Sequence, residues 1–343
     1  MKTILNSIAA GNLLAMLAVA QPQRFIEDAL LQQAEVHPPS SKANPTVTAQ
    51  SYVWPEVPAT EATRGVDTPA SASHSLLVYV ITGSPQFGAV DLRSGTFLPI
   101  GPALPPEVGG GLAQGPGKAL LTLGFSGNLV AIDPVTGITS IVGHTGLGDC
   151  TTPASPCGPN SANGIGLFDG AYYATDFANN LYSLNPKSGA VRLIGLTGIP
   201  ALPFSPLSVN PDGSQNVFNE TLFSARGKLY ANFAAAVRPQ GGPPVIVVPP
   251  AIWEIDPKTG HAKWIAPTEL GLTSIVNVKE TIYAFSVRTG QVVILDVSTG
   301  KTSAVSELDP TAGLIGGATP AHSTLERRSN SYLQGCRGCG SLQ

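Results

Sequence analysis

The stretch IWEIDPKTG at residues 252–260 is one of five versions of a single nine-residue pattern in this 343-residue chain. Each version has apolar residues at positions one and four, Asp or Asn at position five, Ser or Thr at position eight and Gly at position nine. The other four are FGAVDLRSG at 87–95, LVAIDPVTG at 129–137, LYSLNPKSG at 181–189 and VVILDVSTG at 292–300. Internal repeats of about 40–50 residues are typical of propellers, solenoids and arrays.

Each copy predicts a strand, a tight turn and a second strand. Asp or Asn at the first turn position accepts a hydrogen bond from its own backbone two residues later, and Pro134, Pro186 and Pro257 pre-set φ at the next position. Gly at the end supplies the positive φ that a three-residue hairpin requires. The shared residues therefore indicate hairpin chemistry, and the repeated aspartates are expected on turns rather than in a catalytic cluster.

Two more strands are expected before each hairpin. One is rich in aromatic and aliphatic residues and falls at 76–80, 119–123, 171–175, 229–233 and 282–285. The strand before it is small and Gly-rich, at 110–113, 164–168, 221–224 and 273–276. Four antiparallel strands per repeat make a propeller blade. The first repeat lacks its innermost strand, and residues 313–317 have the right character to supply it and close the ring.

Five repeats across residues 75–324 leave about 50 residues per blade, which predicts an all-β, five-bladed β-propeller closed by a C-terminal strand. The longest interval between repeats holds two segments rich in Pro and Gly, 199–218 and 234–250, which are expected to be inserted loops. Six blades are the alternative, if the N-terminal segment or the long insertion hides a degenerate blade.

The segments outside the propeller suggest export. Residues 1–20 resemble a secretory signal, with Lys2, an apolar stretch at 8–19 and a small-residue cleavage site at Ala20. Residues 21–74, rich in Pro, Ser, Thr and Ala, are expected to form a poorly ordered leader. Residues 325–343 are expected to be a flexible tail, in which Arg327-Arg328 is either a processing site or a solvated pair of charges. No other segment is long and apolar enough to span a membrane.

Export favours disulfide bonds. Cys150 and Cys157 lie in one loop, and Cys336 and Cys339 lie close together near the end of the chain, so local bridges are expected in both places. The second pair has no partner Cys pair and no nearby His, which argues against zinc. Asn219 begins the only N-glycosylation sequon, and its expected place at the start of an innermost strand argues against modification unless the preceding loop is exposed.

The third blade carries the sequence ANGIGLFDGAYYATD at 162–176. It resembles the Asn-Gly-aliphatic, Asp-Gly, aromatic, Thr-Asp stretch of the regucalcin/gluconolactonase family of six-bladed propellers, which hold one divalent cation, often calcium, on the axis. That resemblance implies a metal-ligand role for Asn163. In the next blade, Asn219 or Glu220 falls where the family places a ligand and its catalytic base. The resemblance thus makes Glu220 a candidate catalytic residue and Asn163 and Glu220 candidate calcium ligands.

The rest of the family's metal site is not matched. The second blade has Gly109-Gly110-Gly111 where the family has another Asn, and no Glu takes the corresponding place in the first blade. A hard cation prefers six or more oxygen ligands, typically with two or more carboxylates. Asn-Gly and Asp-Gly also form turns readily, so turn formation is the alternative explanation of Asn163 and Asp169.

Other chemistries have weaker support. The five His are scattered, and the chain has no serine-nucleophile elbow and no His-Glu-x-x-His. Its Gly-rich loops lie between strands, which does not suit phosphate binding. The net charge of −3 gives no reason to expect nucleic acid. Trp253 and Trp264 flank one hairpin and are expected to pack within a blade.

Two functions are compatible with these features. The first is a secreted, monomeric propeller that binds or transforms a small-molecule metabolite at its central channel, as a lactonase-like or cyclase-like protein of secondary metabolism. Its channel mouth is expected to be lined by Asn163, Asn219, Glu220 and Ser274. The second is a non-catalytic, lectin-like or surface-binding propeller that recognises a glycan. One site per blade is then expected, although only the hairpin turns repeat closely.

Overall fold

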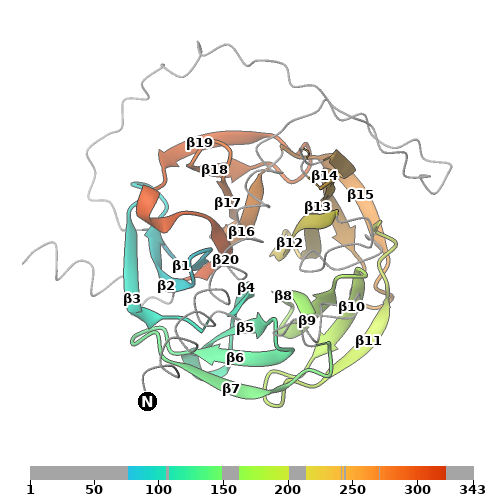
Figure 1. Ribbon diagram of the computed structural model, residues 1–343, viewed down its shortest axis with the longest axis horizontal. Helices are drawn as coiled ribbons and strands as arrows, with labels where there is room; N and C mark the ends of the chain where they lie inside the picture. The colour runs from blue at the N-terminus through green and yellow to red at the C-terminus, as the bar shows by residue number, and fades with distance from the viewer. Residues whose placement is uncertain are drawn as a thin grey trace, which may run out of the picture.

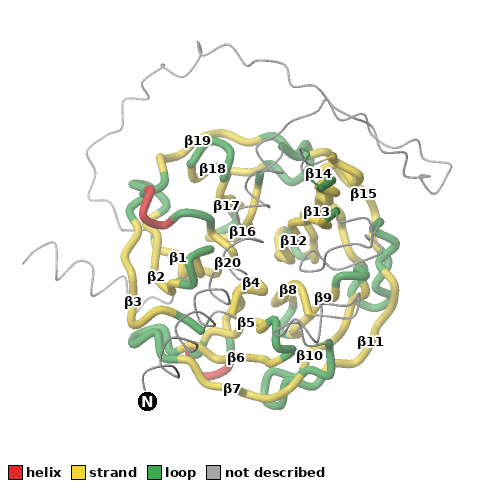
Figure 2. The backbone as a smooth tube through the Cα atoms, in the orientation of Figure 1, coloured by secondary structure: helices red, strands yellow, loops and turns green. Residues whose placement is uncertain are grey.

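The computed structural model describes residues 76–105, 108–148, 162–200, 214–240, 242, 245–269 and 271–321. These residues form five four-stranded antiparallel sheets arranged around a central axis (Figure 1). Almost all of the described backbone is strand or turn (Figure 2), with short 3₁₀ turns at Pro116–Lys118 and Pro310–Ala312. The fold is therefore a five-bladed β-propeller, as the five repeats predict. The described residues form no sixth blade.

Each blade has four strands, and their order runs from the axis outward. Blade one contains β20 (Ile315–Pro320), β1 (Leu77–Thr82), β2 (Gln86–Asp91) and β3 (Phe97–Ala103). Blade two contains β4 (Val108–Gln114), β5 (Leu120–Gly124), β6 (Asn128–Ile132) and β7 (Thr139–His144). Blade three contains β8 (Ala162–Phe168), β9 (Ala171–Asp176), β10 (Asn180–Leu184) and β11 (Val191–Leu196).

The last two blades follow the same order. Blade four contains β12 (Gln215–Ala225), β13 (Lys228–Arg238), β14 (Val245–Ile255) and β15 (Ala262–Pro267). Blade five contains β16 (Leu272–Val278), β17 (Thr281–Ser286), β18 (Gln291–Leu295) and β19 (Thr302–Glu307). The inner strands contact one another in the cyclic order β20, β4, β8, β12, β16 and back to β20, which defines the axis (Figure 1).

The ring is closed by the last strand, as predicted. β20 pairs antiparallel with β1, with Val80 opposite Ala318, and the amide of Ala321 donates to the carbonyl of Leu77 at 3.1 Å. The closing strand lies slightly later than the predicted 313–317, because residues 310–312 form a 3₁₀ turn first. Blade one is thus built from both ends of the described chain, and its inner edge is paired.

The hydrophobic core lies between the blades. Five clusters of buried side chains each combine residues from two neighbouring blades, including the pair of blades five and one. Strands such as β1 (LVYVIT) and β5 (LLTLG) are buried along their whole length because both faces of each sheet are covered. Continuous apolar runs, rather than alternation, are the pattern expected for strands buried on both faces.

The five hairpins have the chemistry predicted from the repeat. In each, the Asp or Asn side-chain oxygen accepts a hydrogen bond from the amide two residues later at 2.8–3.0 Å. The amide of the final Gly donates to the carbonyl of the same Asp or Asn at 2.7–2.9 Å. The five glycines have φ between +69° and +81°. Hydrogen bonds from the amide and hydroxyl of Ser298, and from the hydroxyl of Thr299, lower the pKa of Asp296 to about 2.

The final glycine of each hairpin also touches the outer strand of the preceding blade. A Cβ added there would lie under 3.0 Å from a carbonyl oxygen of that strand. The pairs are Gly137 with Ile100, Gly189 with Gly143, Gly260 with Gly195, Gly300 with Pro267 and Gly95 with Glu307. Each blade also carries a small residue in its own outer strand, six residues after its hairpin glycine. These residues are Gly101, Gly143, Gly195, Ala266 and Ser306. The repeat therefore encodes the contact between blades as well as the turn.

The long insertion differs from the prediction. Residues 234–250, expected to be a loop, instead continue β13 and β14 beyond the blade, with Ala235 opposite Val248 and Val237 opposite Val245. The β-branched run 245–248 suits a strand, and Pro249 and Pro250 are tolerated because the register shifts there. Residues 215–218 of the other expected loop belong to β12, and residues 201–213 lie outside the described chain.

The hairpin contact can be tested with two glycines of similar φ. We expect Gly300→Ala to destabilise the protein much more than Gly290→Ala. Both positions have positive φ (+69° and +64°), so each substitution costs about 1–2 kcal/mol in backbone strain. At Gly300 the added Cβ would also lie 1.7 Å from the carbonyl oxygen of Pro267, whereas nothing lies within 4 Å at Gly290. Overpacking should add roughly 1–3 kcal/mol to the loss of unfolding free energy in denaturant titrations. Equal losses would contradict the contact.

Candidate functional site

The candidate site lies where the inner strands of blades three and four are adjacent. Asn163 is the second residue of β8, at a point where the pairing of β8 with β9 shifts register. The amide of its neighbour Gly164 donates to the hydroxyl of Thr175 at 3.2 Å, which fixes this irregular backbone. Glu220 lies in the middle of β12, opposite Phe233. These two predicted residues come together because β8 and β12 are neighbours around the axis.

The side chains of Asn163 and Glu220 are hydrogen-bonded. Nδ2 of Asn163 donates to Oε2 of Glu220. Oε1 of Glu220 is buried and has no hydrogen-bond partner within the described chain. A buried, unpartnered carboxylate oxygen is costly, because nothing replaces the water that it loses on folding. The arrangement therefore favours the neutral, protonated form of Glu220.

The electrostatic surroundings of Glu220 act in the same direction. Burial raises the pKa of the Glu220 carboxyl to about 8, and the nearby charge of Asp176 adds to the increase. The hydroxyl of Thr175 and the amide of Asn163 stabilise the charged form and partly oppose this rise in pKa. A carboxyl group with a pKa near neutrality is the type of group that enzymes use as a general acid or base.

Asp176 is a buried acid that ends the stretch 162–176 quoted above, and the sequence gave it no role. Its carboxylate accepts hydrogen bonds from the amides of Ala178 and Asn180, from Nδ2 of Asn180 and from the hydroxyl of Tyr182, at 2.7–3.0 Å. Burial raises the pKa of Asp176, and all four of these hydrogen bonds act against that increase. The signal in the sequence was an Asp at a strand end followed by Asn179-Asn180, which is a common turn sequence and gave no reason to expect burial.

The other predicted site residues are less clearly connected to Glu220. Ser274 is buried in β16, 1% exposed, and no hydrogen bond joins it to Glu220 in the part of the chain that the structure describes. Polar links between β12 and β16 come from Thr221, whose hydroxyl donates to the carbonyl of Thr273 at 2.9 Å, and from Asn277, whose Nδ2 donates to the carbonyl of Ser224 at 3.1 Å. Asn219 lies within β12, with its backbone opposite Ala234, and its side chain lies outside the described part of the structure.

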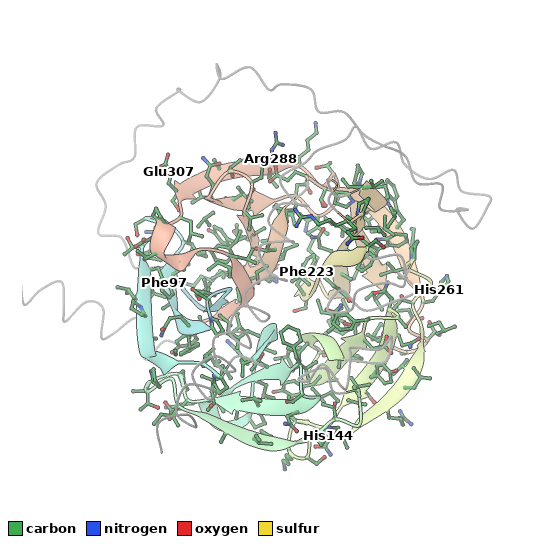
Figure 3. All side chains as sticks on the ribbon, in the orientation of Figure 1. Phe97, His144, Phe223, His261, Arg288 and Glu307 are labelled. Carbon is green, nitrogen blue, oxygen red and sulfur yellow. The ribbon has the colours of Figure 1, made fainter. Side chains whose placement is uncertain are left out.

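Several predictions fall on residues that the structure does not describe. They are the leader and signal, the tail with Arg327-Arg328, and the disulfides Cys150–Cys157 and Cys336–Cys339. The glycosylation prediction at Asn219 concerns a sequon inside β12. Among described residues, His144 and His261 are exposed on the outer rim (Figure 3), far from the inner strands. Trp253 and Trp264 face each other across β14 and β15, as expected for packing within a blade.

The described residues do not fit a calcium site. Glu220 contributes one carboxylate, and one of its oxygens already accepts a hydrogen bond from Asn163. Both carboxylate oxygens of Asp176 are engaged by hydrogen-bond donors. No group of three or more His, Cys, Asp or Glu that could hold a metal occurs among the described residues. Calcium normally takes six to eight oxygen ligands, with several carboxylates.

Comparisons with known proteins give no family. No protein-family model matches the chain, and no curated protein matches it. Among solved structures, the nidogen/laminin complex is 15% identical with a TM-score of 0.42, covering 73% of this chain and 99% of that one.

Two enzymes give weaker similarities. The PQQ-bound aldose sugar dehydrogenase from Streptomyces coelicolor is 14% identical with a TM-score of 0.38, covering 65% of this chain and 87% of that one. A catalytically inactive virginiamycin B lyase from Staphylococcus aureus, with quinupristin, is 11% identical with a TM-score of 0.34, covering 66% and 69%. At these values no functional argument follows, and the fold assignment is based on the strand pairing itself.

The protonation of Glu220 predicts a pH dependence of stability. The pKa of Glu220 is about 8 in the folded state and has an ordinary value of 4.5. Between pH 4.5 and pH 8, Glu220 is therefore protonated in the folded protein and ionised in the unfolded protein. Unfolding then releases one proton, so this group's stabilisation is complete below pH 4.5 and is lost as pH rises toward 8, by about 1.4 kcal/mol per pH unit. We expect Glu220→Gln, which resembles the neutral acid, to remove this slope in urea titrations between about pH 5 and 9.

A surface glutamate provides the control. Glu254 forms an exposed ion pair with Lys228 at 2.8 Å, and Glu254→Gln should change stability by no more than about 1 kcal/mol. Comparing each variant with the unsubstituted protein cancels the contributions of the other titrating groups. Parallel pH profiles for the unsubstituted protein and Glu220→Gln would show that Glu220 ionises normally.

Proposed function

We propose that the site formed by Asn163 and Glu220 binds and transforms a small-molecule metabolite by general acid–base chemistry that does not need a metal. The observation that carries this proposal is the buried Glu220 carboxyl, held at Oε2 by Asn163 and unpartnered at Oε1 within the described chain. Structural carboxyl groups are usually fully hydrogen-bonded when buried, as Asp176 is. A buried acid with an unpartnered oxygen therefore needs an explanation, and a catalytic role is one that the raised pKa also supports.

In this proposal each residue has a limited role. Glu220 would give a proton to, or take one from, the bound molecule at Oε1, and Asn163 would orient the carboxyl group through Oε2. Asp176 would favour the protonated form of Glu220 through its charge. Ser274 and Asn219 remain candidate ligand-contacting residues. The mismatch with calcium ligation supports acid–base chemistry over the metal-assisted reaction that the family resemblance implies.

The proposal predicts conversion that depends on Glu220. The full chain, Glu220→Gln and Glu254→Gln would each be incubated at about pH 7 with a small-molecule extract of the organism that encodes the protein, followed by chromatography and mass spectrometry. We expect at least one compound to be consumed by the unsubstituted protein and Glu254→Gln. Glu220→Gln should be slower by about 10²-fold or more, the usual contribution of a general acid or base. No Glu220-dependent change would contradict the proposal.

We also propose that the protein is exported. The charged start, the apolar stretch at 8–19 and the small residues at 18–20 support this interpretation. No helix in the described part of the chain is long and apolar enough to cross a membrane. N-terminal sequencing of protein collected from the medium of a eukaryotic secreting host should give Gln21 as the first residue. Retention of the full-length chain in the cells would contradict export.

A further inference from the structure

The outer strand β7 lacks the residues that protect the other four outer strands. It is the last strand of blade two and runs along the outside of the ring (Figure 1). Its sequence, TSIVGH, has no Asp, Glu, Lys, Arg or Pro. The other outer strands each have at least one of these: two prolines in β3, Arg192 in β11, Lys263 and Pro267 in β15, and Glu307 in β19. Charges and prolines discourage pairing with another chain, so β7 is the least protected edge among the described strands.

The side chains around this edge are apolar and exposed. Ile141, in β7, is 68% exposed, and Val135 and Ile138, in the adjoining hairpin, are 59% and 61% exposed. On the next outer strand, β11, Leu193 and Leu196 are also largely exposed. Five of the seven exposed large apolar residues in the described chain therefore lie on the rim of blades two and three. Apolar surface gathered in this way, unlike single scattered side chains, is typical of interaction sites.

The pairing with β6 determines which backbone groups of β7 face outward. The amide of Asp133 donates to the carbonyl of Ile138 at 2.9 Å, and the register of β6 with β7 is regular from there as far as Ile141. Bonding in an antiparallel pair alternates along the strand. Ser140 therefore bonds to β6, while Thr139 and Ile141 direct their N–H and C=O groups away from the sheet. These two residues can pair with a further strand.

We propose that β7 pairs antiparallel with β7 of a second copy of this chain, joining the two blade-two sheets into one. The strand is complementary to itself. With Ser140 of each copy on the two-fold axis, Thr139 of one copy lies opposite Ile141 of the second copy, and each such pair exchanges two hydrogen bonds. A contact of this kind uses the same surface on both copies and closes as a dimer.

The lack of charge on β7 favours this occupant. A charged segment would find no opposite charge on the strand, so the partner strand has to be uncharged and apolar, as β7 itself is. The outer edge of blade two lies at the other side of its sheet from the inner strand β4. The dimer is therefore independent of the function proposed for Asn163 and Glu220, which lie on inner strands.

The size of the exposed surface predicts a weak dimer. Complete burial of the five side chains would cover roughly 300 Å² of apolar surface on each copy, at about 100 Å² for a fully exposed aliphatic side chain. A standard stable interface covers about 800 Å² on each partner. We therefore expect dissociation on the order of 10 μM. A weak dimer departs from the monomer expected from the sequence, which did not show the exposure of the rim.

Sedimentation velocity over about 1–200 μM tests the dimer. We expect the unsubstituted protein to pass from monomer to dimer across this range. Ile141→Lys should weaken association by about a hundredfold, because each dimer loses two isoleucine contacts and gains two charges. Ala304→Lys is the matched control and should associate normally, since Ala304 is the third residue of β19, as Ile141 is of β7, and is also exposed.

A cysteine on the two-fold axis tests the register. Directly opposite residues of a non-hydrogen-bonded pair have Cα atoms about 4.5 Å apart, which suits a disulfide. Under mild oxidation, Ser140→Cys should form a disulfide-linked dimer in greater yield than the unsubstituted protein, which has four cysteines of its own. Ser303→Cys, at the equivalent exposed position of β19, should give no such increase.

The proposal is wrong if the protein stays monomeric at about 200 μM. It is also wrong if Ile141→Lys associates as tightly as Ala304→Lys, or if Ser140→Cys cross-links no better than Ser303→Cys. A monomer whose Tm falls in Ile141→Lys but not in Ala304→Lys would overturn it in a different way, because the edge of β7 would then be covered by another segment of the same chain.

Discussion

The close backbone contact between each hairpin and the preceding blade is the constraint on which the ring depends. At all five junctions a glycine with positive φ lies against a carbonyl group of the neighbouring outer strand, with no room for a side chain. Five hydrophobic clusters fill the wedges between the blades further in. Because interiors pack densely and tolerate little extra volume, these contacts set the spacing and angle between blades. The inner strands are therefore brought to the axis in fixed relative positions.

The five junctions between blades are alike, but the inner strands that they position differ from blade to blade. Blades one and two bring glycines to the axis, and a Cβ on Gly317 would lie 2.7 Å from the backbone of Gly111. Blades three to five instead carry the polar residues Asn163, Glu220, Thr221 and Thr273 on their inner strands. On one side of the axis the backbones of the inner strands pack closely, and on the other side the inner strands carry polar side chains, among them the Asn163–Glu220 pair. This asymmetry, rather than the five-fold repeat, gives the molecule a single candidate site.

The sequence predicted the fold well because each repeat determines its hairpin through residues that are close to one another in the sequence. A turn with Asp, Ser or Thr and Gly at fixed offsets determines a hairpin without help from distant residues. The site was predicted only in part. Asn163 and Glu220 were found through a resemblance, but their hydrogen bond depends on β8 and β12 being neighbours, which only the ring arrangement decides. Asp176 and Thr221 were missed because burial and contacts between blades leave no pattern within a short stretch. The strand extension at 245–248 was missed because Pro249-Pro250 indicated a loop.

Closure by the final strand has a consequence for how the protein is made. β20 is the inner strand of the blade that begins with β1, so the first and last described strands form one sheet. During synthesis, blades two to five have all their strands before β20 emerges, whereas blade one does not. Pairing strands so distant in sequence is slow, and the exposed edge of β1 is open to wrong partners until then. The inner edge of β1 therefore stays unpaired until β20 has left the ribosome, and the pairing of this last strand completes the native ring.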